Sequence, residues 1–151
     1  ILRAFLGKTD MPMMTVEELS CNLDDCTGEE LGFAAELLMK NGALDVFMTP
    51  IQMKKFRPGT LLTVISRPED AEKLTDLMLR YTTTLGVRRK TCSRTCIHRS
   101  IETRDTPFGP VRVKVSKGKG IERCKAEYED VARIAREQGI SLREILKEIK
   151  D

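Results

Sequence analysis

The sequence predicts an α+β protein, and two observations lead to that class. Stretches of alternating apolar residues, typical of strands, are interrupted by stretches in which apolar residues recur every three or four positions, as in helices. Within residues 15–103 these stretches run strand, helix, strand, strand, helix, strand, which is the order of the ferredoxin-like βαββαβ core. We expect a β-hairpin strand and two C-terminal helices to follow this core.

The first half of the predicted core is a strand, a helix and a second strand. Residues 15–23 alternate loosely between apolar and polar and predict a strand. Thr27 and Glu30 have the spacing of a capping box, which starts a helix at the next position, and the Asn-Gly pair at 41–42 ends it. Residues 43–53 predict the second strand, and a basic Pro-Gly loop follows it.

The second half of the core has the same elements in the order strand, helix, strand. Residues 60–66 predict a strand, and the spacing of Ser66 and Glu69 predicts a capping box for the next helix. The apolar stripe of that helix is Ala71, Leu74, Met78 and Tyr81. Residues 86–103 predict the last strand. Two helices cover one face of such a sheet, so we expect the C-terminal helices or a second subunit to cover the other.

The remainder of the chain predicts a small extension of this core. A turn, a strand, a basic loop and two helices are expected at 106–109, 111–115, 116–120, 125–138 and 141–150. Ser141 and Glu144 form a further capping box at the start of the last helix.

Composition narrows the class of protein. The chain has 151 residues, which fit one domain with a small extension, and it has no apolar run long enough to span a membrane. Five Cys, an odd number without a secretion signal, predict reduced thiols and a cytoplasmic location. Aromatic residues make up only 5% of the chain, so no cluster of base-stacking side chains is available and we expect no nucleic-acid ligand. Since the first residue is Ile, we expect a fragment or a processed product.

The charges are distributed unevenly along the chain. Residues 1–50 carry three basic and nine acidic side chains, whereas residues 51–151 carry twenty-three basic and fourteen acidic ones. This division suits a metal–polyphosphate ligand, because the cation needs carboxylates and the phosphates need Lys and Arg. An ordinary mixed surface explains the same charges.

Adjacent carboxylates at the junction of the first strand and helix are candidates for a cation site. Asp24 and Asp25 lie in the stretch CNLDDCTGEELG, after the strand and before the capping box. Hard cations such as Mg²⁺ and Mn²⁺ take one or two carboxylates together with waters and phosphate oxygens. The alternative is that both acids favour the positive N-terminus of the helix.

Two further stretches carry candidate phosphate-binding groups. In PIQMKKFRPG the basic residues are Lys54, Lys55 and Arg57, and in YTTTLGVRRK the candidates are Thr83, Thr84 and Arg88. Arg offers a bidentate fork to phosphate and Lys a point charge, while hydroxyl groups donate hydrogen bonds. A solvated hairpin loop and a β-forming threonine run explain them equally well.

A thiol site is the third possibility. Cys92, Cys96 and His98 lie on one predicted strand and would share a face. Cys92 and Cys96 could supply a catalytic thiol or metal ligands, and packing explains the three residues equally well.

Several motifs in the same order resemble one family. The stretch ELSCNLDDCTGEELGFAAELLMKNGALDVFMTPIQMKKFRPGTLLTVI, then TTTLGVR, TPFGPVRVKV and AEYEDV, resemble the C-terminal domain of the nickel-insertion proteins of nickel-pincer nucleotide biosynthesis. The resemblance covers the chain from about residue 15 to its end. Two positions depart from it, since Cys26 stands where methionine is usual and Phe56 where a polar residue is commoner.

The resemblance implies a function. Proteins of this family are CTP-dependent cyclometallases of the lyase or metal-chelatase type, which insert nickel into pyridinium-3,5-bisthiocarboxylic acid mononucleotide to make the lactate racemase cofactor. It implies that residues 1–14 end a linker from a missing N-terminal domain, that 15–103 form the nucleotide-binding core, and that 104–151 extend it. Without that missing domain we expect this chain to bind CTP with Mg²⁺ or Mn²⁺ and not to complete nickel insertion.

The resemblance and the charge pattern together give the predicted site. The cation is assigned to Asp24, Asp25 and Glu30, and the phosphates to Lys54, Lys55, Arg57, Thr83, Thr84, Arg88 and Lys114. We also expect a homo-oligomer. The alternative function is a non-catalytic oligomerisation domain that recruits a protein or RNA partner through a basic surface.

Overall fold

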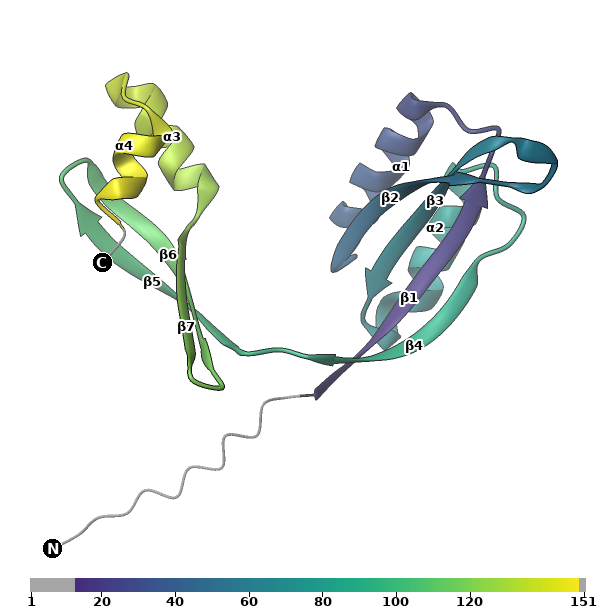
Figure 1. Ribbon diagram of the computed structural model, residues 1–151, viewed down its shortest axis with the longest axis horizontal. Helices are drawn as coiled ribbons and strands as arrows, with labels where there is room; N and C mark the ends of the chain where they lie inside the picture. Colours follow the sequence, from purple (N-terminus) through teal and green to yellow (C-terminus); the bar gives the residue numbers. More distant parts are fainter. Residues whose placement is uncertain (1–12, 150–151) are drawn as a thin grey trace, which may run out of the picture. The chain divides into compact units, whose positions relative to one another are not determined.

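The computed structural model describes residues 13–149, which fall into two compact units (Figure 1). The N-terminal unit is Met13–Arg94, and the C-terminal unit begins at Thr95. Each unit has its own sheet, helices and buried core, so each is described by itself. The predicted α+β class is confirmed, and the strands of both sheets pair antiparallel in the registers that the structure shows.

The N-terminal unit combines a four-stranded sheet with two α-helices, in the predicted sequence order. Its elements are β1 (Met13–Leu23), α1 (Gly28–Lys40), β2 (Asp45–Gln52), η1 (Lys54–Phe56), β3 (Pro58–Ser66), η2 (Pro68–Asp70), α2 (Ala71–Tyr81) and β4 (Arg88–Thr95). The strand order is β2-β3-β1-β4, and both β1 and β2 pair antiparallel with β3. The end of β1 therefore lies opposite the start of β3, beside the loop that joins β2 to β3.

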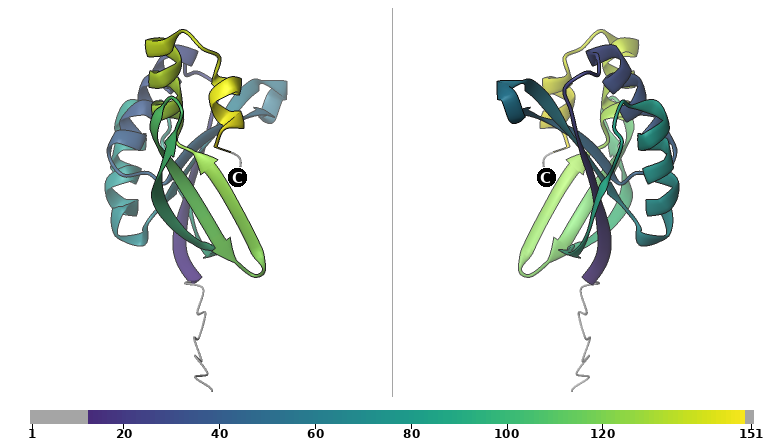
Figure 2. Two further views of the ribbon diagram at one scale, coloured as in Figure 1. Left: turned by 90° about the vertical axis from the view of Figure 1, so that its left-hand side faces the viewer. Right: turned by 90° about the vertical axis from the view of Figure 1, so that its right-hand side faces the viewer.

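The core of this unit lies between the sheet and its helices. Figure 2 shows α1 and α2 side by side on the same face of the sheet. Because side chains alternate along a strand, every second residue of β1 and β3 points toward these helices. The buried core includes Leu19, Cys21, Leu23, Leu38, Leu62, Val64, Leu74 and Met78.

The two helices of the N-terminal unit begin differently. The capping box of α1 is confirmed: the backbone N–H of Thr27 donates to Glu30 Oε2 at 2.7 Å, and the N–H of Glu30 donates to Thr27 Oγ1 at 3.3 Å. The capping box predicted for Ser66 is wrong. Ser66 still belongs to β3, where it pairs with Glu17 of β1, and its hydroxyl is buried without a hydrogen-bond partner among the described residues. The turn η2 separates it from α2.

The C-terminal unit packs two helices on a three-stranded antiparallel sheet. Its elements are β5 (His98–Thr106), β6 (Gly109–Gly118), β7 (Ile121–Ala126), α3 (Tyr128–Gln138) and α4 (Leu142–Lys147). Alternate residues of the central strand β6 meet the apolar faces of the helices in a core that contains Val111, Val113, Val115, Val131, Ile134 and Ile145. The capping box of Ser141 and Glu144 is confirmed.

The strand predicted over 86–103 is wrong, because it is two strands in two sheets. β4 extends the N-terminal sheet beside β1, whereas from His98 the chain pairs with β6, His98 opposite Lys117. Residues 96 and 97 belong to neither strand. Alternation marks residues as extended but does not identify the strand with which they pair. This break places the boundary between the units at Arg94 and Thr95.

The loop predicted over 116–120 and the helix start predicted at 125 are also wrong. β6 continues to Gly118, and a two-residue turn of Lys119 and Gly120 leads into β7, which was not predicted. Both turn residues have positive φ, 50° and 72°, as in the tight turns of β-hairpins. The apolar residues of β7 do not alternate with polar ones, and its residues 121–125 are exposed, so its sequence gives little sign of a strand.

Candidate functional site

The end of β1 places two carboxylates at one edge of the N-terminal unit. Leu23 is buried as the last strand residue, and Thr27 begins the cap of α1, so the chain leaves the sheet over residues 24–26. Asp24 and Asp25 are both on the exposed part of this connection. They are therefore held between a strand end and a helix start, where the backbone is fixed at both sides.

The β2–β3 loop is attached to the same strand end. The backbone N–H of Met53 donates to the carbonyl of Arg57 at 2.8 Å and closes the loop, and Arg57 Nη1 donates to Asp24 Oδ2 at 3.1 Å. A Cβ built on Gly59 would lie 2.9 Å from the Leu23 carbonyl oxygen, so the absence of a side chain permits this close approach. The loop thus lies directly beside Asp24.

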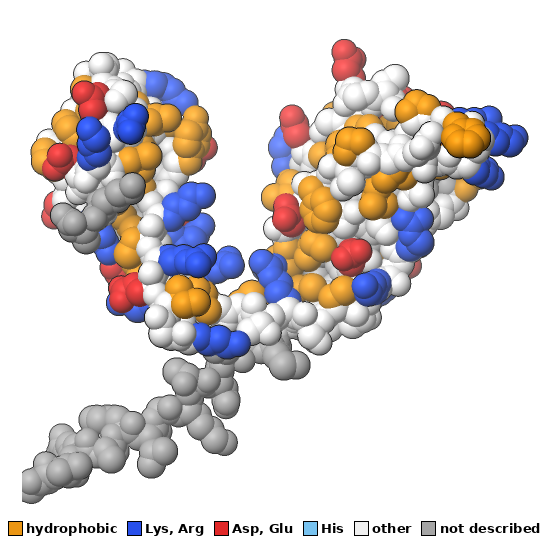
Figure 3. All heavy atoms as spheres, in the orientation of Figure 1, with side chains coloured by type: hydrophobic (Ala, Val, Ile, Leu, Met, Phe, Trp, Pro, Cys, Tyr) orange, Lys and Arg blue, Asp and Glu red, His pale blue; other side chains and the backbone are white. Residues whose placement is uncertain are grey.

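The tip of this loop carries exposed basic side chains. Lys54 and Lys55 form no side-chain hydrogen bond or ion pair with any residue in the described part of the chain. Lys55 and Phe56 have positive φ, 62° and 58°, and Phe56 is 87% exposed. Figure 3 shows Lys and Arg side chains gathered over this loop. The left-handed backbone costs about 1–2 kcal/mol per residue, which is typical of loops held in place for binding.

A third segment reaches the carboxylates from the loop between α2 and β4. Thr83 Oγ1 donates to Asp25 Oδ1 at 2.5 Å, and Arg88 Nη2 donates to Asn22 Oδ1 at 2.7 Å. Thr84 is engaged within its own loop, where its hydroxyl donates to the Gly86 carbonyl at 2.9 Å.

The structure therefore brings together five of the ten predicted site residues, from three segments distant in sequence. We call this set of residues, Asp24, Asp25, Arg57, Thr83 and Arg88, the strand-end cluster; its members lie up to 64 residues apart in the sequence, from Asp24 to Arg88. Asn22 also contacts it and was not predicted. Its only sequence signal is a polar residue near the end of a strand.

Two predicted residues stand apart from this cluster. Glu30 is engaged by the capping box, and the backbone N–H and hydroxyl of Thr27 lower the pKa of its carboxyl. Lys114 lies on β6 of the C-terminal unit, where its ammonium group pairs with Glu127 at 3.0 Å. The roles assigned to Glu30 and Lys114 stay predictions.

The thiols next to the cluster are not disposed to act as thiolates. Burial raises the pKa of the Cys21 thiol, and burial together with the Glu30 carboxylate raises that of Cys26. Both thiols are therefore protonated at neutral pH, and thiolates are the form that binds metals. All five cysteines are free.

The thiol site predicted farther along the chain does not form as expected. Cys92 lies in β4, Cys96 lies between two strands, and His98 begins β5, so the prediction that they share a strand face is wrong. Within residues 13–149 no group of three or more His, Cys, Asp or Glu could hold a metal ion.

The strand-end cluster offers two carboxylate oxygens that a hard divalent cation could use. The hydrogen bonds described above use Oδ2 of Asp24 and Oδ1 of Asp25, so the other oxygen of each carboxylate makes no hydrogen bond in the described region. Two carboxylate oxygens are too few to complete a coordination shell, but Mg²⁺ and Mn²⁺ usually add waters and substrate phosphates to such a pair. Arg57 and Arg88 lie where they could bind those phosphates.

Fold and cluster together describe a small α+β protein with a candidate site for a polyphosphate and its cation. None of the helices in residues 13–149 is long and apolar enough to cross a membrane. The family described as nickel insertion protein matches residues 1–146. The chain belongs to this family.

Comparisons with individual proteins agree with this family assignment. The chain is 47% identical over 127 residues to a pyridinium-3,5-bisthiocarboxylic acid mononucleotide nickel insertion protein of Lactiplantibacillus plantarum, covering 84% of this chain and 30% of that protein. For the protein of the same name in Acetivibrio thermocellus, identity is 42%, over 95% of this chain and 36% of the relative. The chain thus spans about a third of the length of these curated relatives.

A solved structure is similar over nearly all of its own length. It is the apo form of the C-terminal domain of a cyclometallase involved in the synthesis of the NPN cofactor of lactate racemase. The TM-score is 0.86 at 44% identity, and the match covers 91% of this chain and 96% of that one.

Proposed function

We propose that this chain is the CTP-binding part of a nickel insertion protein, and that it binds CTP with Mg²⁺ or Mn²⁺ at the strand-end cluster. The complete protein would use CTP to insert nickel, its metal substrate, into pyridinium-3,5-bisthiocarboxylic acid mononucleotide. It would thereby act as a cyclometallase of the lyase type in making the cofactor of lactate racemase. The names of the relatives support the reaction, and the family resemblance supports CTP.

One observation carries the choice of site. Two carboxylates, two arginines and a threonine hydroxyl from three distant segments meet at one end of the sheet, beside two lysines without partners in the described chain. Arg57 neutralises Asp24 in this arrangement. A bound cation would take over that carboxylate and allow Arg57 to turn to a phosphate, so the cluster is suited to bind the two together.

We further assign the N-terminal unit to the ferredoxin-like class. The element order β1-α1-β2-β3-α2-β4 and the strand order β2-β3-β1-β4 support this assignment. In this arrangement the end of β1, the β2–β3 loop and the α2–β4 loop are all at one edge. That is why the three segments of the cluster can converge.

Calorimetric titration of the chain with CTP in the presence of Mn²⁺ tests the proposal. Lys54→Ala should weaken binding about tenfold, the effect of losing one charged hydrogen bond. Asp25→Asn keeps the size of the side chain and removes its charge, so it should abolish the Mn²⁺ dependence of binding.

The matched control is Lys40→Ala, since Lys40 lies in the last turn of α1, about 20 Å along the helix from the cluster. This variant should bind as the parent does. If CTP and Mn²⁺ do not bind, or if Lys54→Ala and Asp25→Asn bind unchanged, the site is wrongly assigned. The predicted homo-oligomer is tested separately by the mass from light scattering.

A further inference from the structure

The C-terminal unit contains a pocket that the proposed CTP site does not use. Its volume is about 610 Å³, within the range of roughly 300–1,000 Å³ common for small-molecule sites. We call it the β7–α4 pocket. Its lining residues are Arg104, Cys124, Lys125, Ala126, Arg143, Leu146, Lys147 and Ile149. All of them belong to the C-terminal unit, so the pocket is complete within it.

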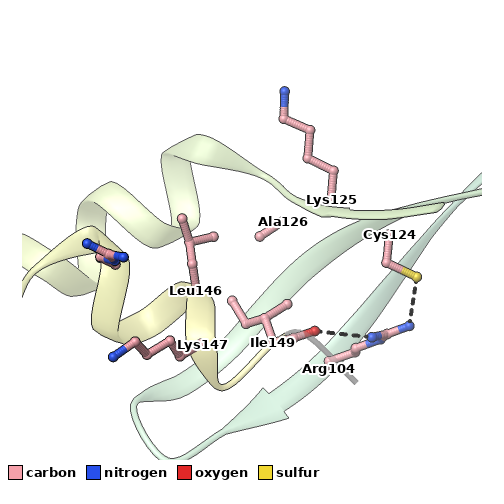
Figure 4. Close-up of a pocket in the computed structure, with 8 residues that line it drawn as sticks. Arg104, Cys124, Lys125, Ala126, Leu146, Lys147 and Ile149 are labelled. Carbon is pink, nitrogen blue, oxygen red and sulfur yellow. Dashed lines mark hydrogen bonds between the residues drawn. The ribbon is translucent and has the colours of Figure 1, made fainter.

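The floor of the pocket is apolar. Figure 4 shows Ala126 of β7 facing Leu146 and Ile149, which lie at and just after the end of α4. Ile149 and Ala126 are buried, but Leu146, which lines the same pocket, is 40% exposed. When a flat organic group covers a large exposed apolar side chain of this kind, the burial of apolar surface contributes favourably to the free energy of binding.

The polar groups of the pocket are positively charged and lie at its two ends. Four of the eight lining residues are Lys or Arg, and none is acidic. At one end, Arg104 donates to the Ile149 carbonyl at 3.4 Å and to Cys124 Sγ at 3.3 Å, and it also pairs with Glu102 at 4.0 Å, so its guanidinium group is held in place (Figure 4). Lys147 lies at the other end, and Arg143 is one helical turn before it on the same side of α4.

Two of these cations have no partner among the described residues. The side chains of Lys125 and Arg143 form no hydrogen bond or ion pair with any residue in the 13–149 region. In Figure 4, Lys125 extends away from the floor, so its charge lies at the rim. Such cations around an apolar floor favour an anion with an apolar body over a simple ion, which would gain nothing from the floor.

We propose that the β7–α4 pocket binds a pyridinium mononucleotide whose ring carries carboxylate or thiocarboxylate groups, the class of molecule to which the nickel acceptor belongs. The flat ring would cover Leu146 and Ala126, with a carboxylate or phosphate at each end of the pocket. This identification of the ligand rests on the proposed function. It gives the chain separate sites for the nucleoside triphosphate and for the molecule to be metallated.

Nicotinate mononucleotide is a suitable probe, because it combines a pyridinium ring, one carboxylate and a ribose phosphate. We expect the chain to bind it in a calorimetric or NMR titration and to bind inorganic phosphate much more weakly. The double variant Arg143→Gln, Lys147→Gln should lose affinity by about tenfold or more. Leu146→Glu, at a partly exposed position that tolerates a polar group, should abolish binding by placing a negative charge on the floor.

The control is Arg136→Gln, which removes a positive charge from α3 outside the pocket and should bind the probe like the parent. The proposal is overturned if the probe does not bind at millimolar concentration, if phosphate alone binds as well, or if both pocket variants bind normally. Loss of binding in Asp25→Asn with the pocket variants unaffected would place the probe at the strand-end cluster and also overturn it. CTP titrations of the same variants report on the CTP site independently.

Discussion

The ion pair between Arg112 of β6 and Asp130 of α3 joins the sheet of the C-terminal unit to a helix, and its contribution to stability can be measured. The guanidinium Nε and Nη2 atoms of Arg112 donate to the two carboxylate oxygens of Asp130, both at 2.9 Å, and the Arg112 backbone N–H donates to Oδ2 at 2.9 Å. These hydrogen bonds lower the pKa of Asp130 from 3.8 to about 2, the side-chain hydrogen bond from Arg112 contributing most. We predict that Asp130→Asn destabilises this unit at neutral pH.

The magnitude follows from the pKa. One unit of pKa corresponds to about 1.4 kcal/mol, so the lowered pKa sets an upper value of about 2.5 kcal/mol. The Arg112 side chain is 55% exposed, and solvent screening reduces this to about 1–2 kcal/mol. Because the folded-state pKa is below the ordinary value, the stabilisation is complete above about pH 4. It is lost as the pH falls through about 2.

Urea unfolding followed by tyrosine fluorescence measures this difference. The chain has two tyrosines and no tryptophan, so a Tyr81→Phe background leaves Tyr128 of α3 as the reporter of the C-terminal unit. The free energy of unfolding should be lower for Asp130→Asn than for the parent at pH 7, and the difference should shrink from pH 4 to pH 2. Equal stabilities at pH 7, or an unchanged difference at pH 2, would refute the reasoning.

Three further substitutions test other parts of the structure. Ser66→Ala should be neutral or stabilising in urea unfolding, because the buried hydroxyl has no partner in the described chain; a loss of about 1 kcal/mol would instead indicate a capping role. Gly59→Ala should cost about 1–3 kcal/mol and weaken CTP binding, since its Cβ would lie 2.6 Å from Met53 Sδ and 2.9 Å from the Leu23 carbonyl oxygen; unchanged stability and affinity would contradict this. Ser141→Ala should cost the C-terminal unit about 1 kcal/mol in thermal unfolding and weaken binding of the mononucleotide probe, and a variant as stable as the parent would show that the cap does not hold α4.

The sequence predicts the N-terminal unit well because its signals are local. The capping box of α1, the Asn-Gly stop and the alternation of β1 and β3 all act within a few residues. Ser66 shows the limit of such signals. Its spacing to Glu69 fits a cap, but pairing with Glu17 extends β3 through that position, and a contact 49 residues away cannot be recognised from local spacing.

The C-terminal unit is predicted less well because its boundaries depend on pairing. Residues 86–103 are predicted as one extended segment, and nothing within them shows that the chain changes sheet near Ile97. A Cβ on Gly118 would lie 3.1 Å from Ile97 Cγ2, so the side chain of Ile97 packs directly against the end of β6. The turn of Lys119 and Gly120 lacks the Asn-Gly or Asp-Gly pair most typical of hairpins, and β7 was missed with it.

The two candidate sites also differ in how far the sequence predicts them. The residues of the strand-end cluster could be named from sequence because each belongs to a stretch of unusual composition, although only the fold shows that Arg57 and Thr83 reach the same carboxylate pair. The β7–α4 pocket had no such signal. Arg143 and Lys147 on α4 have the spacing of an ordinary solvated helix face, and they gain significance only when β7 supplies Ala126 opposite Leu146. A pocket built from β5, β7 and α4 becomes visible only when β7, which the sequence does not reveal, is in place.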